Sequence, residues 1–209
     1  MSYDLSGILL NISVLIFAIV VHEVAHGYVA YRLGDPTAHR SNRLSLNPLD
    51  HVDPMGSIIV PLFLVLTNSS VMLGWAKPVP IDPRYFRHPR RDEVLVSLAG
   101  VTANLILAAI AGLFFRALAP APNSTLDVFL ILACRTNVAL AVFNLMPIPP
   151  LDGSHIVAAL LPPRAAESFQ RISRAGIILI YLLLFVGALN KVMVPVMRSL
   201  ERLFLGGGA

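Results

Sequence analysis

The strongest constraint in this sequence is the pentapeptide His22-Glu23-Val24-Ala25-His26, which closes an apolar run that begins near residue 5. Residues 8–21 of that run contain only two polar side chains. On a helix, this spacing places the two imidazoles on one face, where they can share a metal ion, and the glutamate between them can hold a water as general base. Ionisable groups inside a membrane helix are costly and tend to be functional or paired. The sequence therefore predicts a hydrolytic metal site inside a bilayer.

The composition places the whole chain in the membrane class. Of its 209 residues, 56% are hydrophobic and 13% are charged, and its mean hydropathy is +0.73, whereas soluble domains carry about 25% charged residues. The net charge of +4 is concentrated in loops, where it sets membrane orientation, and no basic tail points to nucleic acid. The single Cys134 excludes a disulfide within the chain.

Four apolar stretches approach the ~20 residues that a helix needs to cross the hydrocarbon core. We read the first as a retained span because it lacks the basic start and the cleavage site of a signal peptide. The tail is amphipathic enough to lie at an interface. We expect an all-α polytopic membrane protein of one domain, residues 1–209, with a catalytic core at about 5–160 and a C-terminal span and tail at 172–205. The four stretches are residues 5–31, 93–118, 126–146 and about 175–189, and the tail is residues 191–205.

Basic residues fix the expected orientation of these spans. They cluster after the first span, before the second and after the third, and they are absent from the connector 119–125 and from residues 1–10. Because cytoplasmic loops carry the excess of Lys and Arg, the three basic segments are predicted to be cytoplasmic and the N-terminus to lie outside. We expect a prokaryotic plasma (inner) membrane protein whose metal site faces the cytoplasm.

That orientation makes residues 55–73 a special segment. Both of its flanks lie on the predicted cytoplasmic side, so it must enter the membrane and return on that side. Pro61 and the polar residues 67–70 supply a turn, and non-helical backbone at that depth needs protein or water around it. We expect a re-entrant hairpin or strand-like element beside the metal site.

Two histidines leave a zinc site one protein ligand short, since catalytic zinc usually takes three protein ligands and a water. The downstream candidates are Asp127, Asp152 and His155. The topology brings Asp152 to the depth of the His-Glu-x-x-His motif and leaves Asp127 roughly a membrane thickness away. Three prolines just before Asp152 break the helix there. The alternative role for Asp152 is N-cap of a following helix, residues 153–160.

Three features together resemble the site-2 protease family of intramembrane zinc metalloproteases. They are the HEVAH motif, the segment from Asn144 to Gly153 with its Leu-Asp-Gly end, and Gly100-x-x-x-Asn104 in the middle span. The resemblance covers about residues 14–156, and residues 74–80 resemble the compact bacterial and archaeal branch. No PDZ domain is inserted and no CBS domains follow, so substrate rules of PDZ-containing members are not carried over.

The resemblance implies a zinc endopeptidase that holds one Zn²⁺ per chain on His22, His26 and Asp152 and cuts in or near transmembrane segments of single-span membrane proteins. Glu23 is then the general base, which takes a proton from the attacking water and passes it to the leaving amine. Asn144 resembles the family's asparagine that hydrogen-bonds the substrate or the oxyanion; its alternative role is an amide cap that ends the helix.

Three further polar residues have open roles. Asn104 either binds the substrate backbone or lies in a helix contact that Gly100 makes close. His155 is either a support for a metal ligand or incidental. Arg135 falls near the middle of the third span, where a charge is expensive, and should face protein or water; the sequence suggests no partner for it.

Two other functions remain open at this stage. A metal transporter would need ligands distributed across the bilayer, whereas the candidates here cluster at one depth. A catalytically silent metal-binding or chaperone relative would be expected to lose Glu23 or a ligand, and all four groups are present. The sequence leaves the substrate and the oligomeric state undetermined.

Overall fold

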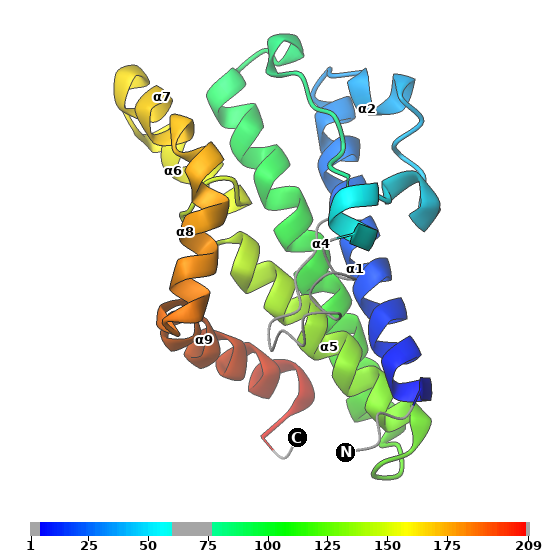
Figure 1. The fold of residues 1–209 in the computed structure, drawn as a ribbon. Coiled ribbons are helices and arrows are strands. Elements are labelled where there is room, and N and C mark those ends of the chain that lie inside the picture. Colours follow the sequence, from blue (N-terminus) through cyan, green and yellow to red (C-terminus); the bar gives the residue numbers. More distant parts are fainter. Residues whose placement is uncertain (1–4, 60–76, 208–209) are drawn as a thin grey trace.

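The computed structural model describes residues 5–59 and 77–207, and all regular elements within these ranges are helices. Three of them are long and apolar enough to cross a membrane: α1 (Leu5–Arg32), α4 (Pro89–Leu118) and α5 (Thr125–Asn144). Figure 1 shows these three helices side by side. A fourth candidate is the pair α7 (Pro163–Arg171) and α8 (Ser173–Phe185), bent by 65°. The prediction of an all-α polytopic membrane protein is confirmed.

Local signals explain where the long helices begin and end. At the end of α1, Gly34 adopts φ +109°, a left-handed conformation that glycine reaches without a steric penalty and that commonly ends helices. Helix α4 begins with Pro89, whose missing N–H costs nothing at a first helical position. Helix α5 begins after Ser124, whose side chain accepts a hydrogen bond from the Asp127 amide. The loops that connect α1, α4 and α5 therefore begin and end outside the apolar parts of these helices.

Helix α4 is the centre of the bundle and packs against α1, α5, α6 (Asp152–Leu160) and α9 (Ala188–Leu205). Its buried face is rich in small residues, including Gly100, Ala108, Ala111 and Gly112. A Cβ at Gly112 would lie 2.7 Å from the Phe204 carbonyl oxygen of α9. Because small side chains let helix backbones approach closely, the composition of α4 is what lets it pack against these helices.

The connection between α5 and α6 turns the chain sharply. It contains Pro147, Pro149 and Pro150, which donate no backbone hydrogen bonds and cannot continue a regular helix. Gly153 then packs against the carbonyl groups of Leu145 and Met146, where a side chain would collide. This folds the start of α6 back beside the end of α5, and α6 packs against α4.

Helix α9 supplies the partner that the sequence did not suggest for Arg135. The Arg135 Nε lies 3.5 Å from the Glu201 Oε2, and α9 contacts both α5 and α4 through buried side chains such as Leu189 and Met193. The predicted amphipathic tail is thus a helix whose apolar side faces protein; its position relative to a bilayer remains a prediction.

The segment predicted to be re-entrant is described only in part. Residues 55–59 belong to a π-helical turn, η2 (Pro54–Ile59), so a strand-like conformation is wrong for them. The remainder, residues 60–73, lies outside the described residues. Upstream, α2 (Thr37–Arg40) and η1 (Pro48–His51) lead into this segment. Downstream, an extended stretch and η3 (Pro83–Tyr85) lead into α4.

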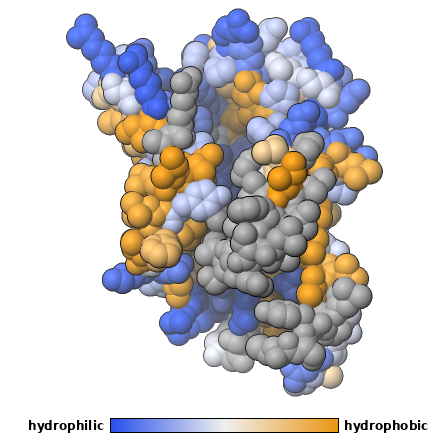
Figure 2. Space-filling view, viewed as in Figure 1, coloured by the Kyte–Doolittle hydropathy of each residue, from blue (hydrophilic) through white to orange (hydrophobic). Residues whose placement is uncertain are grey.

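Figure 2 shows hydrophilic side chains toward both ends of the molecule and apolar ones between them along the sides of the bundle. Many large apolar side chains on the spanning helices are exposed, for example Phe17 on α1 and Leu113 on α4. In water such surfaces would be unfavourable, and in a bilayer they face lipid tails. The surface agrees with a membrane-embedded bundle.

Candidate metal centre

Helices α1 and α6 bring His22, His26 and Asp152 together. The two imidazole Nε2 atoms are 2.9 Å apart, and the Asp152 Oδ2 lies 3.1 Å from the His22 Nε2 and 3.3 Å from the His26 Nε2. The histidines are 6% and 7% exposed. Zinc ligands at about 2.0–2.2 Å in tetrahedral geometry are themselves about 3.3 Å apart. The three ligand atoms therefore have the spacing of a zinc site.

The other ring nitrogens of the two histidines decide which atoms face the metal. The His22 Nδ1 lies 2.6 Å from the Asn104 Oδ1, and the His26 Nδ1 lies 2.7 Å from the Val96 carbonyl oxygen. Both partners are acceptors, so each Nδ1 carries the proton and each Nε2 presents a lone pair. This arrangement fixes the neutral tautomer that binds metals.

These contacts also test whether a metal fits. Two Nε2 lone pairs that face each other at 2.9 Å repel unless a cation lies between them. The buried Asp152 Oδ2 has no hydrogen-bond partner among the described residues, although a buried carboxylate oxygen is costly to leave unpaired. A cation bound by all three atoms satisfies each of them, and the mixed N and O donor set suits zinc. The residues present fit the metal.

Asp152 does not act as the N-cap of α6. The helix begins at Asp152, its N-cap is Leu151, and no side-chain hydrogen bond caps it. The carboxylate instead points toward the two histidines. The capping alternative for this residue is therefore wrong.

Gly100 on α4 faces the same site. A Cβ at this position would lie 2.5 Å from the His26 Nε2 and 2.6 Å from the His22 Nε2. Real side chains do not approach that closely, so the glycine leaves the space in front of the ligand atoms open. In the Gly100-x-x-x-Asn104 pattern, the glycine thus leaves room beside the ligand atoms. One helix turn later, the Asn104 side chain accepts the hydrogen bond from the His22 Nδ1.

Asn104 is fully buried and uses both ends of its amide on protein groups. Besides accepting from His22, it donates through Nδ2 to the Ala18 carbonyl oxygen at 3.2 Å and to the Asn137 Oδ1 at 2.8 Å. The Asn137 Nδ2 in turn donates to the Ala133 carbonyl oxygen at 2.9 Å. All of these contacts are to protein groups, unlike the substrate contact that was one of the two roles open for Asn104. They form a chain of hydrogen bonds from α5 through α4 to the candidate metal ligand His22.

We predict that Asn104→Ala lowers zinc affinity by about 10- to 100-fold, because groups that orient metal-bound histidines carry effects of that size. Competition with a zinc-binding dye measures the dissociation constant in detergent. The matched control is Asn11→Ala, since the Asn11 side chain bonds only the Gly7 carbonyl of its own exposed helix turn among the contacts described. Equal affinities of the two variants would contradict the role of Asn104.

Glu23 is held by a backbone amide. Its Oε2 accepts a hydrogen bond of 2.9 Å from the Val79 N–H, which comes from the extended stretch ahead of α4. The sequence could not reveal this contact, because Glu23 and Val79 are 56 residues apart. Glu23 lies between the two histidines on α1, so the candidate general base and the candidate ligands share one helix turn.

The remaining predicted residues lie at different places. The Asn144 Nδ2 donates to the Leu140 carbonyl oxygen at 3.0 Å within the last turn of α5. Asp127 lies in the first turn of α5 and bonds the Asn123 and Ser124 region, at the opposite end of the helix from Asn144. His155 lies on α6, three residues after Asp152. Asp127 is therefore excluded from the site, as the topology predicted.

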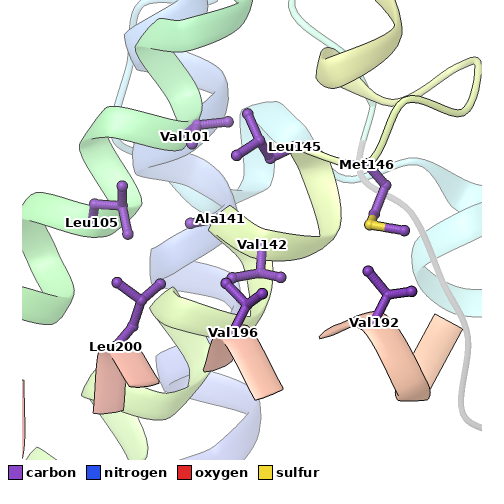
Figure 3. Close-up of a pocket in the computed structure, with 9 residues that line it drawn as sticks. All are labelled: Val101, Leu105, Ala141, Val142, Leu145, Met146, Val192, Val196 and Leu200. Carbon is purple, nitrogen blue, oxygen red and sulfur yellow. The ribbon is translucent and has the colours of Figure 1, made fainter. Parts of the chain in front are cut away.

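A separate apolar cavity of about 180 Å³ lies between α4, α5 and α9. Figure 3 shows its lining side chains, which include Val101 and Leu105 from α4 and Val192, Val196 and Leu200 from α9. None of the three metal-site residues lines it. The cavity is thus distinct from the metal centre.

Comparison with known proteins assigns the family. The model of "Peptidase family M50" matches residues 117–187. A Bacillus subtilis (strain 168) protein named "Putative zinc metalloprotease YwhC" is 39% identical over 197 residues, which cover 90% of this chain and 85% of the relative. A Mycolicibacterium smegmatis protein named "Putative zinc metalloprotease Rip2" is 28% identical over 84% of this chain and 66% of the relative. No solved structure matches the chain.

A membrane bundle with this ligand set around a His-Glu-x-x-His motif defines an intramembrane zinc metalloprotease. The chain belongs to peptidase family M50. This membership agrees with the resemblance to site-2 proteases and with zinc as cofactor. It sets aside the metal-transporter alternative, and the catalytically silent alternative is disfavoured because Glu23 and all three candidate ligands are present.

Proposed function

We propose that this protein is an endopeptidase that cleaves single-span membrane proteins in or near their transmembrane segments, as a step in regulated intramembrane proteolysis. The observation that carries the proposal is the burial of the ligand set within the helix bundle: His22 and His26 lie on a candidate span and are 6% and 7% exposed. A peptide bond that reaches these residues must come to them inside the membrane domain. A transmembrane substrate already lies at that depth.

Each residue has a separate task in this proposal. His22, His26 and Asp152 hold one zinc ion, which when bound polarises the scissile carbonyl and activates a water. Glu23 accepts the proton of the attacking water and delivers it to the leaving amine. The contacts of Asn104 support a role in orienting His22, in place of substrate binding. Asn144, at the end of α5 beside the proline-rich turn, hydrogen-bonds the substrate or the developing oxyanion.

We further propose that the protein resides in the plasma (inner) membrane of a prokaryote with its active site toward the cytoplasm. The support is the clustering of basic side chains at one end of the bundle. Arg32, Arg87 and Arg91 line a polar cavity of about 340 Å³ there, between the end of α1 and the start of α4. The connector between α4 and α5 at the other end contains no Lys or Arg. Excess positive charge favours the cytoplasmic side.

We expect the purified protein in detergent to cleave members of a panel of single-span substrates, to lose this activity with a zinc chelator, and to regain it when zinc is restored. Gel electrophoresis detects the fragments, mass spectrometry locates the cut, and elemental analysis gives the zinc content. Cleavage that persists with chelator, or active protein with almost no zinc, would overturn the mechanism. Cuts found only in extramembrane loops would overturn the assignment of the substrate segment.

A further inference from the structure

An extended segment, residues 77–82, which we term the strap, lies against α1 at Glu23 and Gly27, beside the metal centre. Hydrogen bonds to four partner residues fasten it to other described parts of the chain. The Lys77 N–H donates to the His51 carbonyl oxygen at 2.9 Å, and the Arg43 Nη2 donates to the Lys77 carbonyl oxygen at 2.6 Å. The Asp82 N–H donates to the Asp35 Oδ2 at 2.7 Å. The fourth partner is Glu23, which accepts from the Val79 N–H.

The strap's composition singles out the Val79 amide. Its neighbours Pro78 and Pro80 have no N–H, and each proline fixes its own φ near −65°. Proline also keeps the residue before it in an extended conformation, so Lys77 and Val79 are both held extended. The middle of the strap therefore offers one backbone donor in a stiff frame, and that donor points at the candidate general base.

The close approach of the strap to α1 depends on Gly27. A Cβ at this position would lie 2.8 Å from the Val79 Cγ1 and 2.8 Å from the Leu44 Cδ2. Gly27 is four residues after Glu23, so it lies on the same face of α1. The Val79 side chain is 5% exposed. Because Gly27 has no side chain, the Val79 side chain can pack against α1 one helix turn from Glu23, which brings the Val79 amide within reach of the Glu23 carboxylate.

The anchors of the strap are buried polar side chains outside the metal centre. Asp35 is fully buried and accepts from the Thr37 N–H and hydroxyl as well as from Asp82. Arg43 is 7% exposed and also donates to the Pro78 carbonyl oxygen at 3.4 Å. Burying charged groups is costly unless they are bonded. Two such groups bonded to the short strap indicate that the strap's position matters.

We propose that the strap positions the general base: the Val79 N–H holds one carboxylate oxygen of Glu23, which leaves the other to face the attacking water. Asp35, Arg43 and Gly27 are positioning residues that act on Glu23 through Val79. This proposal rests on the proposed peptidase function. A general base must lie within about 2.6–3.2 Å of the proton it takes, and an error of about 1 Å can cost on the order of 100-fold in rate. A glutamate side chain with three free torsions does not hold such a geometry unaided.

The first test separates positioning from zinc binding. Arg43→Met and Gly27→Ala are expected to lower kcat about 10- to 100-fold, with unchanged KM and unchanged zinc content. Arg43→Lys keeps a donor for the Lys77 carbonyl and should recover part of kcat. Asp50→Ala is the matched control, because its side chain takes no part in the bonds that fasten the strap, and it should retain full kcat. Loss of zinc in parallel with kcat, or no rescue by lysine, would assign these residues a merely structural role.

The second test needs no catalytic activity. Amide hydrogen exchange of the ¹⁵N-valine-labelled protein in detergent should show Val79 exchanging at least about tenfold faster in Glu23→Ala than in the unchanged protein, because the amide has lost its acceptor. The Lys77 amide, labelled in the same way, should keep its protection, since its acceptor is His51. An unchanged Val79 rate would overturn the proposal. If no substrate is cleaved by the unchanged protein, the peptidase function fails, and the exchange result still decides the Val79–Glu23 contact.

Discussion

Glu23→Gln is expected to abolish peptide cleavage while leaving zinc bound. Glutamine has nearly the same shape and can still accept the hydrogen bond from the Val79 N–H, but it cannot take a proton from water. General acid–base catalysis contributes about 10²- to 10⁴-fold, so we expect kcat to fall by at least about 100-fold. Zinc content should stay at one ion per chain, because the ligand atoms of His22, His26 and Asp152 are untouched.

The matched control for this variant is Glu167→Gln. Glu167 lies on α7 and pairs with Arg171 at 3.8 Å, with both side chains largely exposed, so its loss should leave both kcat and zinc content unchanged. Rates from a fluorescent single-span substrate and elemental analysis of the same samples give the two quantities. A Glu23→Gln enzyme that turned over at a near-normal rate would remove Glu23 from its catalytic role.

Gly100→Ala is expected to empty the metal centre. The added methyl would lie 2.5 Å from the His26 Nε2 and 2.6 Å from the His22 Nε2, in the space in front of both ligand atoms. Either the imidazoles turn away and lose their bonds to Asn104 and Val96, or α4 moves away from α1. Both outcomes spoil the ligand geometry, so we expect zinc affinity to fall by at least about the 10- to 100-fold seen when ligand orientation is lost, and activity with it.

Gly7→Ala provides the control for the general effect of alanine in a membrane helix. A Cβ at Gly7 meets nothing within 4 Å, and alanine favours helix by up to about 1 kcal/mol over glycine. This variant should therefore be as stable as the unchanged protein and bind zinc normally. Equilibrium dialysis with zinc and thermal unfolding in detergent measure both properties. Normal zinc binding by Gly100→Ala would show that the site is built differently from this structure.

The metal centre itself was largely readable from the sequence. A separation of four residues puts His22 and His26 on one face of any α-helix, so the pair needs no tertiary information. Asp152 required one more step, because it follows from the direction of the spans and the charge of the loops. The structure brings these three residues together. Local periodicity and loop charge are both written in the chain itself, which is why these predictions were possible.

The contacts that hold the ligands and Glu23 in place could not be predicted from local periodicity or loop charge. The sequence offered Asn104 two roles, substrate binding or a close helix contact, but its bond to His22 joins residues 82 positions apart. The acceptor for His26 and the donor for Glu23 are backbone groups of Val96 and Val79, and backbone groups leave no mark in the residue identities. The partner of Arg135 is on α9, which the sequence placed at an interface.

The sequence alone therefore identified three helices long and apolar enough to cross a membrane, a metal-binding pair on the first of them, and the acidic residue that joins it, because hydropathy, helical spacing and charge bias act along the chain. The fourth predicted span, about residues 175–189, is interrupted at Gly187 between α8 and α9. The tertiary structure decided how the site is held: the acceptors that orient each imidazole, the glycine that keeps the ligand atoms clear, and the amide that holds Glu23. Those features depend on the relative placement of α1, α4 and the segment between them. That placement comes from the packing of small residues and buried polar groups, which no local pattern specifies.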